Sequence, residues 1–166
     1  MVVMNCSAID TSLGNASSES VSNDDPITRC TECKGKATPV SRKTVLLMLK
    51  SHLLEQAMPG SYSFCAASDC DVVYFEKQGG HSFATDDLRI RVGVKVKIDP
   101  IPVCYCFGFD ESHIREEIST LGETTVPAKI LKLISEGLCA CDTRNPAGVC
   151  CLGEINRTVK RLSTNS

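Results

Sequence analysis

The sequence lacks both an excess of charge of one sign and a long apolar segment. Its 166 residues carry a formal net charge of −2, and a chain without a polyelectrolyte segment is a poor partner for nucleic acid. The longest stretch without a charged residue runs from Gln56 to Ser68. A membrane span needs roughly 18 to 20 apolar residues. We therefore expect a soluble protein with no nucleic-acid partner and no membrane span.

A secretory signal and a catalytic constellation are also missing. Residues 1–5 have neither the basic nor the apolar region of such a signal, which favours the cytoplasm. No nucleophile stands beside a recognisable base, and His81 and His113 are isolated in the sequence. We therefore expect no enzymatic activity.

Cysteine, in contrast, is abundant, with 11 copies in a chain that has no tryptophan. A secreted disulfide scaffold favours an even count, whereas a cytosolic chain keeps its thiols reduced and groups them for metal or redox chemistry. Most of the cysteines form close pairs: Cys30-x-x-Cys33, Cys104-x-Cys106, Cys139-x-Cys141 and Cys150-Cys151. Thiols this close in the chain suit a shared metal ion better than separate disulfides.

Periodicity and turn residues predict an α+β fold in three segments. Residues 1–26, rich in Ser, Asn and Asp, are interpreted as a disordered tail in which Cys6 is an incidental thiol. Residues 27–99 are predicted to form a zinc-stapled, strand-rich half with one helix. A Pro-Ile-Pro sequence then stops both strands and helices. Residues 100–166 are predicted to form a small helical half that binds a 2Fe-2S cluster.

Within the first half, apolar residues recur at helical spacing over 41–57, which predicts a helix with His52 on its exposed side. Short β-prone runs lie at 62–64 and 72–75. Residues 88–98 alternate between apolar and mainly basic side chains. This alternation predicts a half-buried strand with a basic, solvated outer face.

Three helices are predicted in the second half. Asp110 has the character of an N-cap for the first, and Pro127 and Gly137 bracket the second. The third is predicted to run from near Cys151 to Leu162.

Two cysteine pairs in the first half have the arrangement of a closed structural zinc site, which takes four thiolates from two close pairs. They are Cys30-x2-Cys33 and Cys65-x4-Cys70. A redox role for the first pair is disfavoured, because no strong helix start and no thioredoxin-like βαβ pattern accompany it. A copper-binding CxxC loop of the ferredoxin-like chaperone kind normally sits in a domain without a second cysteine pair.

Six further cysteines fall in the second half: Cys104, Cys106, Cys139, Cys141, Cys150 and Cys151. An all-thiolate 2Fe-2S cluster needs four of them. Ligands just before one helix and at the start of another would bring backbone N–H groups near the cluster sulfides. Spacing alone leaves a second zinc ion open, and it would pair Cys139 with Cys141.

Two family resemblances bear on this choice. The sequence VCYCFGFDESHIR, which begins at Val103, resembles the opening of bacterioferritin-associated ferredoxin-like domains, which carry a 2Fe-2S cluster. It departs from them where Cys139-A-Cys141 and NPAGVCC replace a second CxxC. Residues 29–153 are also similar to the zinc and 2Fe-2S domain at the front of CopZ-type copper chaperones, through CTEC, FCAASDCDVVYF, LRIRVGVK, VCYC and NPAGVCCLG.

The resemblance to CopZ-type chaperones implies the ligands residue by residue. It assigns zinc to Cys30, Cys33, Cys65 and Cys70. It assigns the cluster to Cys104, Cys106, Cys141 and Cys151. Cys139 and Cys150 are then accessory thiols.

The copper-binding domain of those chaperones, with its own CxxC loop and βαββαβ pattern, has no counterpart in residues 1–166. The resemblance therefore implies a cytoplasmic metallochaperone-like or redox accessory protein in copper handling. Its expected partners are a copper chaperone, a metal transporter or a redox protein. Two alternatives stay open: a dedicated electron-transfer ferredoxin-like protein, and a structural interaction module.

Overall fold

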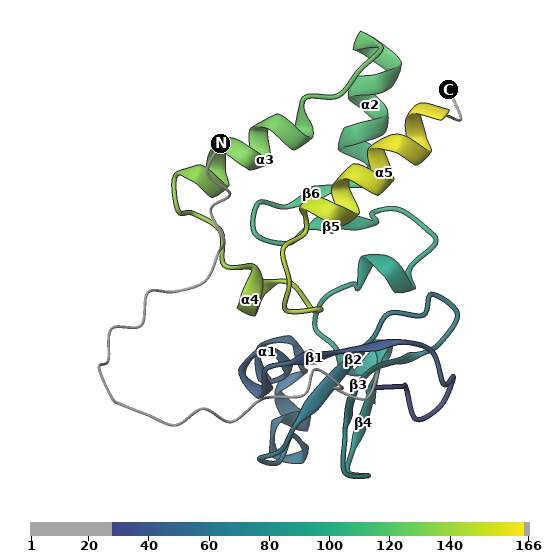
Figure 1. The fold of residues 1–166 in the computed structure, drawn as a ribbon, viewed down its shortest axis with the longest axis vertical. Helices are drawn as coiled ribbons and strands as arrows, with labels where there is room; N and C mark the ends of the chain where they lie inside the picture. Colours follow the sequence, from purple (N-terminus) through teal and green to yellow (C-terminus); the bar gives the residue numbers. More distant parts are fainter. Residues whose placement is uncertain (1–27, 165–166) are drawn as a thin grey trace, which may run out of the picture.

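The computed structural model describes residues 28–164, in which a sheet-containing half lies below a helical half (Figure 1). This mixed architecture confirms the predicted α+β class. The tail predicted over 1–26, with Cys6, lies outside the described residues. Over the described part of the chain, no helix is long and apolar enough to cross a membrane.

The first half is built on an antiparallel sheet of four strands in the order β1-β2-β3-β4. The strands are β1 (Ala37–Val40), β2 (Tyr62–Cys65), β3 (Val72–Glu76) and β4 (Ser82–Ala84). The strands predicted at 62–64 and 72–75 are thereby confirmed. Every residue of β2 is buried. The buried residues form a main core, which includes Val45 and Tyr74, and a smaller one around the first-half cysteines.

The helix predicted over 41–57 is shorter than expected. Helix α1 spans Arg42–Met48, and a separate 3-10 helix takes Ser51–Gln56. Between them the fully buried Leu49 adopts an extended backbone and pairs in an isolated β-bridge with Leu88. This long-range pairing ends the helix, because an extended residue cannot continue it.

The strand predicted over 88–98 is wrong. The segment is irregular and contains a 3-10 turn at Gly93–Lys95. Two of its basic side chains face main-chain carbonyls of other segments, Arg89 towards Leu49 and Lys95 towards the loop before β3. Arg89, Arg91 and Lys97 nevertheless stay exposed, so most of the predicted basic face is solvated, and only Lys95 is partly buried.

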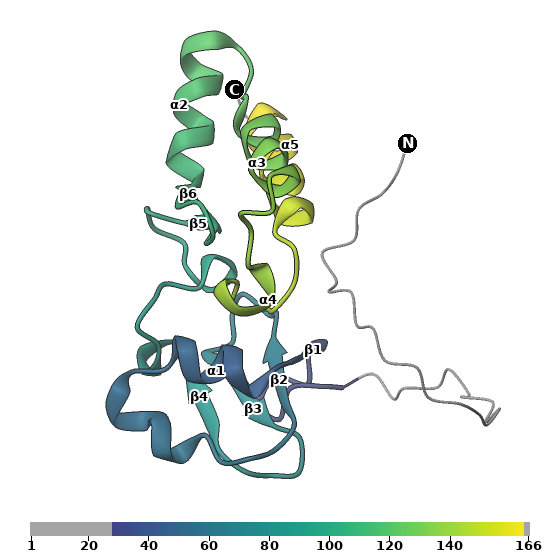
Figure 2. The same cartoon turned by 90° about the vertical axis from the view of Figure 1, so that its left-hand side faces the viewer.

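The second half contains the three predicted helices. They are α2 (Glu111–Leu121), α3 (Val126–Ser135) and α5 (Leu152–Thr164). The sequence did not indicate the short α4 (Cys141–Arg144) or the hairpin of β5 (Pro102–Cys104) and β6 (Phe109–Asp110). Helix α5 packs against both α2 and α3 (Figures 1 and 2). Their apolar faces enclose a second core with fully buried Ile114, Ile130 and Ile155.

Asp110 caps α2 as predicted, since its carboxylate accepts hydrogen bonds from the N–H groups of Ser112 (2.9 Å) and His113 (3.3 Å). Asp110→Ala is expected to lower the free energy of unfolding by about 1 kcal/mol, because these N–H groups lose their acceptor. Chemical denaturation of both proteins measures the difference. Asp110→Asn keeps an acceptor oxygen and should retain most of the stability. An equal loss in both variants would show that the cap is not the cause.

The two halves are joined by hydrogen bonds to the segment around α4. The Thr44 hydroxyl donates to the carbonyl of Asp142 (2.7 Å), and the Tyr74 hydroxyl donates to the carbonyl of Pro146 (2.8 Å). Both bonds cross the domain boundary predicted at residues 99–100. The boundary itself stays a prediction.

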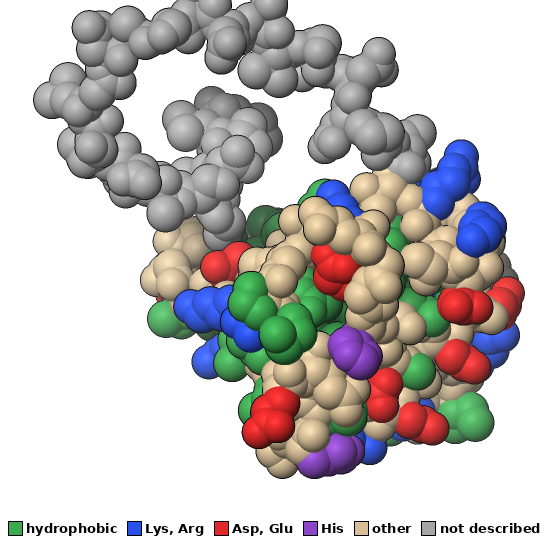
Figure 3. Space-filling view, turned by 90° about the horizontal axis from the view of Figure 1, so that it is seen from below, with side chains coloured by type: hydrophobic (Ala, Val, Ile, Leu, Met, Phe, Trp, Pro, Cys, Tyr) green, Lys and Arg blue, Asp and Glu red, His purple; other side chains and the backbone are tan. Residues whose placement is uncertain are grey.

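The face of the first half that points away from the helices carries mixed charge. Acidic and basic side chains are interspersed there with hydrophobic ones (Figure 3). His52 and His81 are both exposed, so the prediction for His52 is confirmed.

Candidate metal centre

The first cysteine pair lies on a tight turn that precedes β1. The Cys30 N–H donates to the carbonyl of Gly35 (2.9 Å), and the Lys34 N–H donates to the carbonyl of Cys30 (3.1 Å). Lys34 has a left-handed backbone with φ of 59°. The Gly35 N–H donates to Cys33 Sγ at 3.4 Å. This closed turn holds two sulfurs in a fixed relation and gives one of them a backbone donor.

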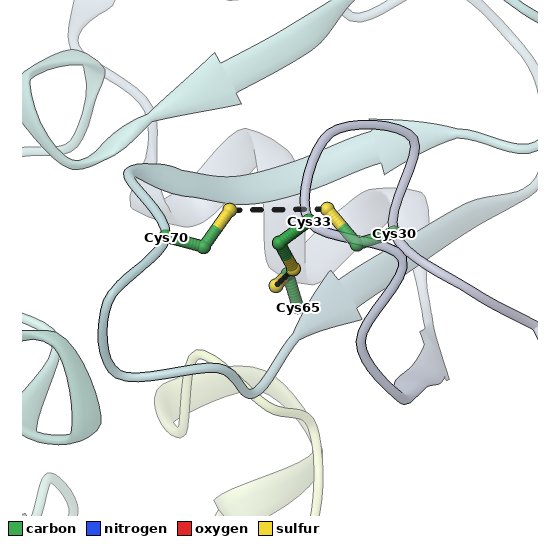
Figure 4. Close-up of side chains that lie close together, drawn as sticks. All are labelled: Cys30, Cys33, Cys65 and Cys70. Carbon is green, nitrogen blue, oxygen red and sulfur yellow. Dashed lines mark hydrogen bonds between the residues drawn. The ribbon is translucent and has the colours of Figure 1, made fainter.

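The second pair comes from the end of β2 and the loop before β3. Cys65 is the last residue of β2 and lies opposite Ala37 of β1, so strand pairing brings the turn next to it. The four sulfurs point towards one another (Figure 4). Cys30 Sγ lies 3.9 Å from Cys70 Sγ, and Cys33 Sγ lies 3.7 Å from Cys65 Sγ.

These separations fit a single tetrahedral metal ion. All four sulfurs lie within 4.8 Å of one another. A zinc ion with four thiolates at about 2.3 Å separates its sulfurs by about 3.8 Å, close to the two measured distances. Within residues 28–164, this is the one group of three or more cysteine, histidine or acidic ligand atoms that comes so close. The donor set therefore fits a closed structural zinc site.

Burial and hydrogen bonding shift the pKa values of these thiols in opposite directions. Burial raises the pKa of Cys65 to about 12 and also raises the pKa of Cys70. The Gly35 N–H is the main cause that lowers the pKa of the exposed Cys33 to about 7. At neutral pH the buried thiols therefore keep their protons unless a cation replaces them, which couples metal binding to proton release.

Four cysteines of the second half meet as two pairs. The Cys151 thiol donates to Cys104 Sγ at 3.4 Å, and Cys106 Sγ lies 3.6 Å from Cys141 Sγ. Each pair joins one residue of the CxC sequence, at β5, to one residue near α4 or α5. No three of their sulfurs come within 4.8 Å of one another among the described residues. They therefore do not surround one point.

Two separate thiol pairs fit a binuclear centre. In an all-thiolate 2Fe-2S cluster each iron takes two cysteines, whereas a single zinc ion needs four sulfurs about equally close. The Ala140 N–H donates to Cys106 Sγ at 3.3 Å. The Cys151 thiol, with the backbone N–H groups of Phe107 and Cys106, lowers the pKa of Cys104 to about 6. These donors favour a thiolate at Cys104, whereas burial raises the pKa of Cys141 and the hydrogen bond with Cys104 raises the pKa of Cys151.

The remaining second-half cysteines stand beside these pairs. Cys139 is partly buried and packs against the second core, and Cys150 is exposed. Their accessory role stays a prediction. The sequence did not reveal that the N–H groups of Gly35 and Ala140 donate to cysteine sulfurs. Every residue except proline has a backbone N–H, so the residue type does not show which of them points at a sulfur.

Known proteins share both the sequence and the fold. Residues 27–89 match a family described as "Zinc binding domain". The chain is 33% identical over 130 residues to the copper chaperone CopZ of Archaeoglobus fulgidus; the match covers 78% of this chain and 60% of that protein. This chain thus spans less than two thirds of that relative.

The solved structure of the Archaeoglobus fulgidus CopZ N-terminal domain has a TM-score of 0.65 and 33% sequence identity to this chain. The match covers 78% of this chain and 96% of that domain. The chain therefore belongs to the family of the zinc-binding CopZ N-terminal domain.

Proposed function

We propose that the chain is a zinc and 2Fe-2S protein that assists copper handling in the cytoplasm. The contrast between the two cysteine groups carries this proposal. The group Cys30, Cys33, Cys65 and Cys70 converges on one point and would hold zinc. The group Cys104, Cys106, Cys141 and Cys151 divides into two pairs and would hold the cluster.

The two sites have different roles in this proposal. Zinc has no redox chemistry, so its site holds the fold together. The cluster, when bound, supplies one-electron transfer. The chain's own contribution is to place four thiolates and to direct the N–H group of Ala140 at one of them. The relative named as a copper chaperone supports a copper chaperone or a metal transporter as partner, and a role as carrier instead of enzyme.

Metal content tests the proposal. Protein purified without oxygen, after expression with sufficient iron and sulfide, is expected to contain about one zinc and two irons per chain. The first four-cysteine group suits a single zinc ion, and the second suits the two irons of a cluster. Elemental analysis and a visible spectrum provide the measurement, and the protein should be red-brown. Two zinc ions and no iron would refute the cluster assignment.

A ferredoxin-like electron carrier is the second candidate. It is favoured by the position of the second thiol group near the surface, where Cys106 is partly exposed and Cys150, beside Cys151, is exposed. NMR titration with a copper(I)-loaded chaperone domain separates the two roles. Binding there supports copper handling, whereas reversible reduction by a reductase without such binding supports the carrier. A cluster that does not cycle reversibly would leave a structural interaction module.

A further inference from the structure

A single 3-10 turn, Gly93–Lys95, contacts both cysteine groups. The turn lies in the irregular segment between β4 and β5, and it is closed by the Lys95 N–H, which donates to the carbonyl of Val92 at 2.8 Å. The side chain of Lys95, its last residue, reaches the loop between β2 and β3. Its first backbone N–H reaches the CxC sequence of the second group.

Lys95 binds the backbone of the loop between β2 and β3, which follows Cys65 and contains Cys70. Its ammonium donates to the carbonyls of Ala67 (2.6 Å), Cys70 (2.9 Å) and Val72 (2.9 Å). An ammonium group has three protons, so the three carbonyls use all of them. One of the three belongs to Cys70 itself. The cation therefore fixes the path of the backbone between Cys65 and β3, and with it the position of Cys70 Sγ.

Gly93 binds the CxC sequence. Its N–H donates to the hydroxyl oxygen of Tyr105 at 2.7 Å, and Tyr105 is the residue between Cys104 and Cys106. A Cβ atom at Gly93 would lie 2.0 Å from the carbonyl oxygen of Pro102. The backbone of the turn therefore packs directly on β5, the strand that ends at Cys104.

We propose that the Gly93–Lys95 turn is a strut that couples the two metal sites. Lys95 is a positioning residue for the zinc ligand loop, and Tyr105 is a positioning residue for the CxC ligands. Removal of zinc loosens the loop that Lys95 holds, shifts the turn and thereby weakens the second site. The inference rests on the proposed function for the identity of the metals, whereas the contacts do not depend on it.

Lys95→Met tests the first contact. It keeps the length of the side chain and removes the cation, so zinc transfer to a chromogenic chelator is expected to be about tenfold faster or more, as the loss of charge-assisted hydrogen bonds implies. Lys97→Met is the matched control. Lys97 pairs with Asp69 of the same loop at 2.7 Å, but both side chains are more than 70% exposed, and such pairs contribute little. Equal rates in the two variants would overturn the role of Lys95.

Tyr105→Phe tests the coupling. In the wild type, removal of zinc is expected to speed the loss of cluster absorbance about tenfold. This is the size of effect expected when the hydrogen bond between the Gly93 N–H and the Tyr105 hydroxyl is disrupted. In Tyr105→Phe the same treatment should change the rate by about twofold or less, because the acceptor of the Gly93 N–H is gone. Tyr74→Phe removes another phenol hydrogen bond between the halves, outside the turn, and should keep the wild-type response. A full response in Tyr105→Phe would overturn the strut.

A second readout separates this inference from the proposed function. Mass spectrometry gives the alkylation rates of Cys104 and Cys151 in iron-free protein, with and without one equivalent of zinc. Zinc should slow both rates in the wild type and in Tyr74→Phe, but much less in Tyr105→Phe. If metal analysis finds no iron, the cluster assignment fails while this comparison still decides the strut. The absence of any zinc effect in the wild type would refute the coupling.

Discussion

Cys65→Ala is expected to abolish zinc binding and to lower the free energy of unfolding by several kcal/mol. A structural zinc ion contributes directly to folding, with apparent binding free energies of about 10 to 16 kcal/mol in zinc-finger peptides. Cys65 is fully buried, so its removal also leaves a cavity and three thiols without their metal. Cys30→Ala should have the same effect, since Cys30 is 1% exposed. Thermal unfolding and zinc analysis of each variant provide the measurement.

The size of the effect follows from the small core that surrounds this site. Apart from the cysteines, its buried members among residues 28–164 are only Ala37, Val72 and Phe75, with Ala67 partly buried. Such a core gains little from apolar burial. Ordering the turn before β1 costs about 1 to 2 kcal/mol for each residue fixed. We therefore expect zinc, bound at the proposed site, to be the main force that holds the turn against the sheet.

A change at an exposed cysteine is the control for this prediction. Cys150→Ala removes a thiol outside both proposed ligand sets, and it should leave zinc content and melting temperature unchanged. The cluster spectrum of Cys65→Ala is expected to weaken as a consequence of the lost zinc. Full zinc occupancy and native melting in Cys30→Ala or Cys65→Ala would show that these residues are not ligands of one ion.

Local signals in the sequence were sufficient for the helices of the second half. Asp110 supplies an oxygen that caps α2, and Pro127 stands in the first turn of α3. Gly137 follows α3 with a left-handed backbone, φ 73°, which glycine adopts without steric cost. Each of these residues affects only the helix turn next to it, so the local sequence is sufficient to predict where these helices begin and end.

Long-range contacts explain the two errors in the first half. The predicted helix breaks at Leu49 because that residue pairs with Leu88. The predicted strand over 88–98 is absent because, within the described residues, its backbone pairs with no strand of either sheet and makes a single bridge at Leu88. Alternation of apolar and basic residues is compatible with a strand, but it does not show whether a neighbouring strand is present to pair with that segment.

The cysteine groups show the same limit. Spacing identified Cys30-x2-Cys33 and Cys65-x4-Cys70 as two pairs, and the structure brings their sulfurs together. Spacing also suggested a pair of Cys139 with Cys141, whereas the structure places Cys106 against Cys141. The loops between distant elements determine which sulfurs meet, and residue spacing does not describe those loops.

Substitutions in the second half are expected to separate ligands from neighbouring thiols. Cys141→Ser and Cys151→Ser should abolish the visible spectrum of the cluster or shift it markedly. Each removes one member of a sulfur pair, Cys141 with Cys106 at 3.6 Å and Cys151 with Cys104 at 3.4 Å. In each variant, one of the two irons would be left with one thiolate where an all-cysteine cluster supplies two, and the other iron would keep its pair.

The matched controls lie one or two residues away in the sequence. Cys139→Ser and Cys150→Ser should keep the spectrum and about two irons per chain, because Cys139 packs against the second core and Cys150 faces solvent. Absorption spectra and iron analysis of all four variants, prepared together without oxygen, measure the difference. Loss of the cluster in Cys139→Ser with its retention in Cys141→Ser would reverse the assignment and favour the pairing that spacing alone suggests. Loss in Cys141→Ser and Cys151→Ser alone would support one ligand at the start of α4 and one just before α5, because these two positions complete the pairs that the CxC sequence begins.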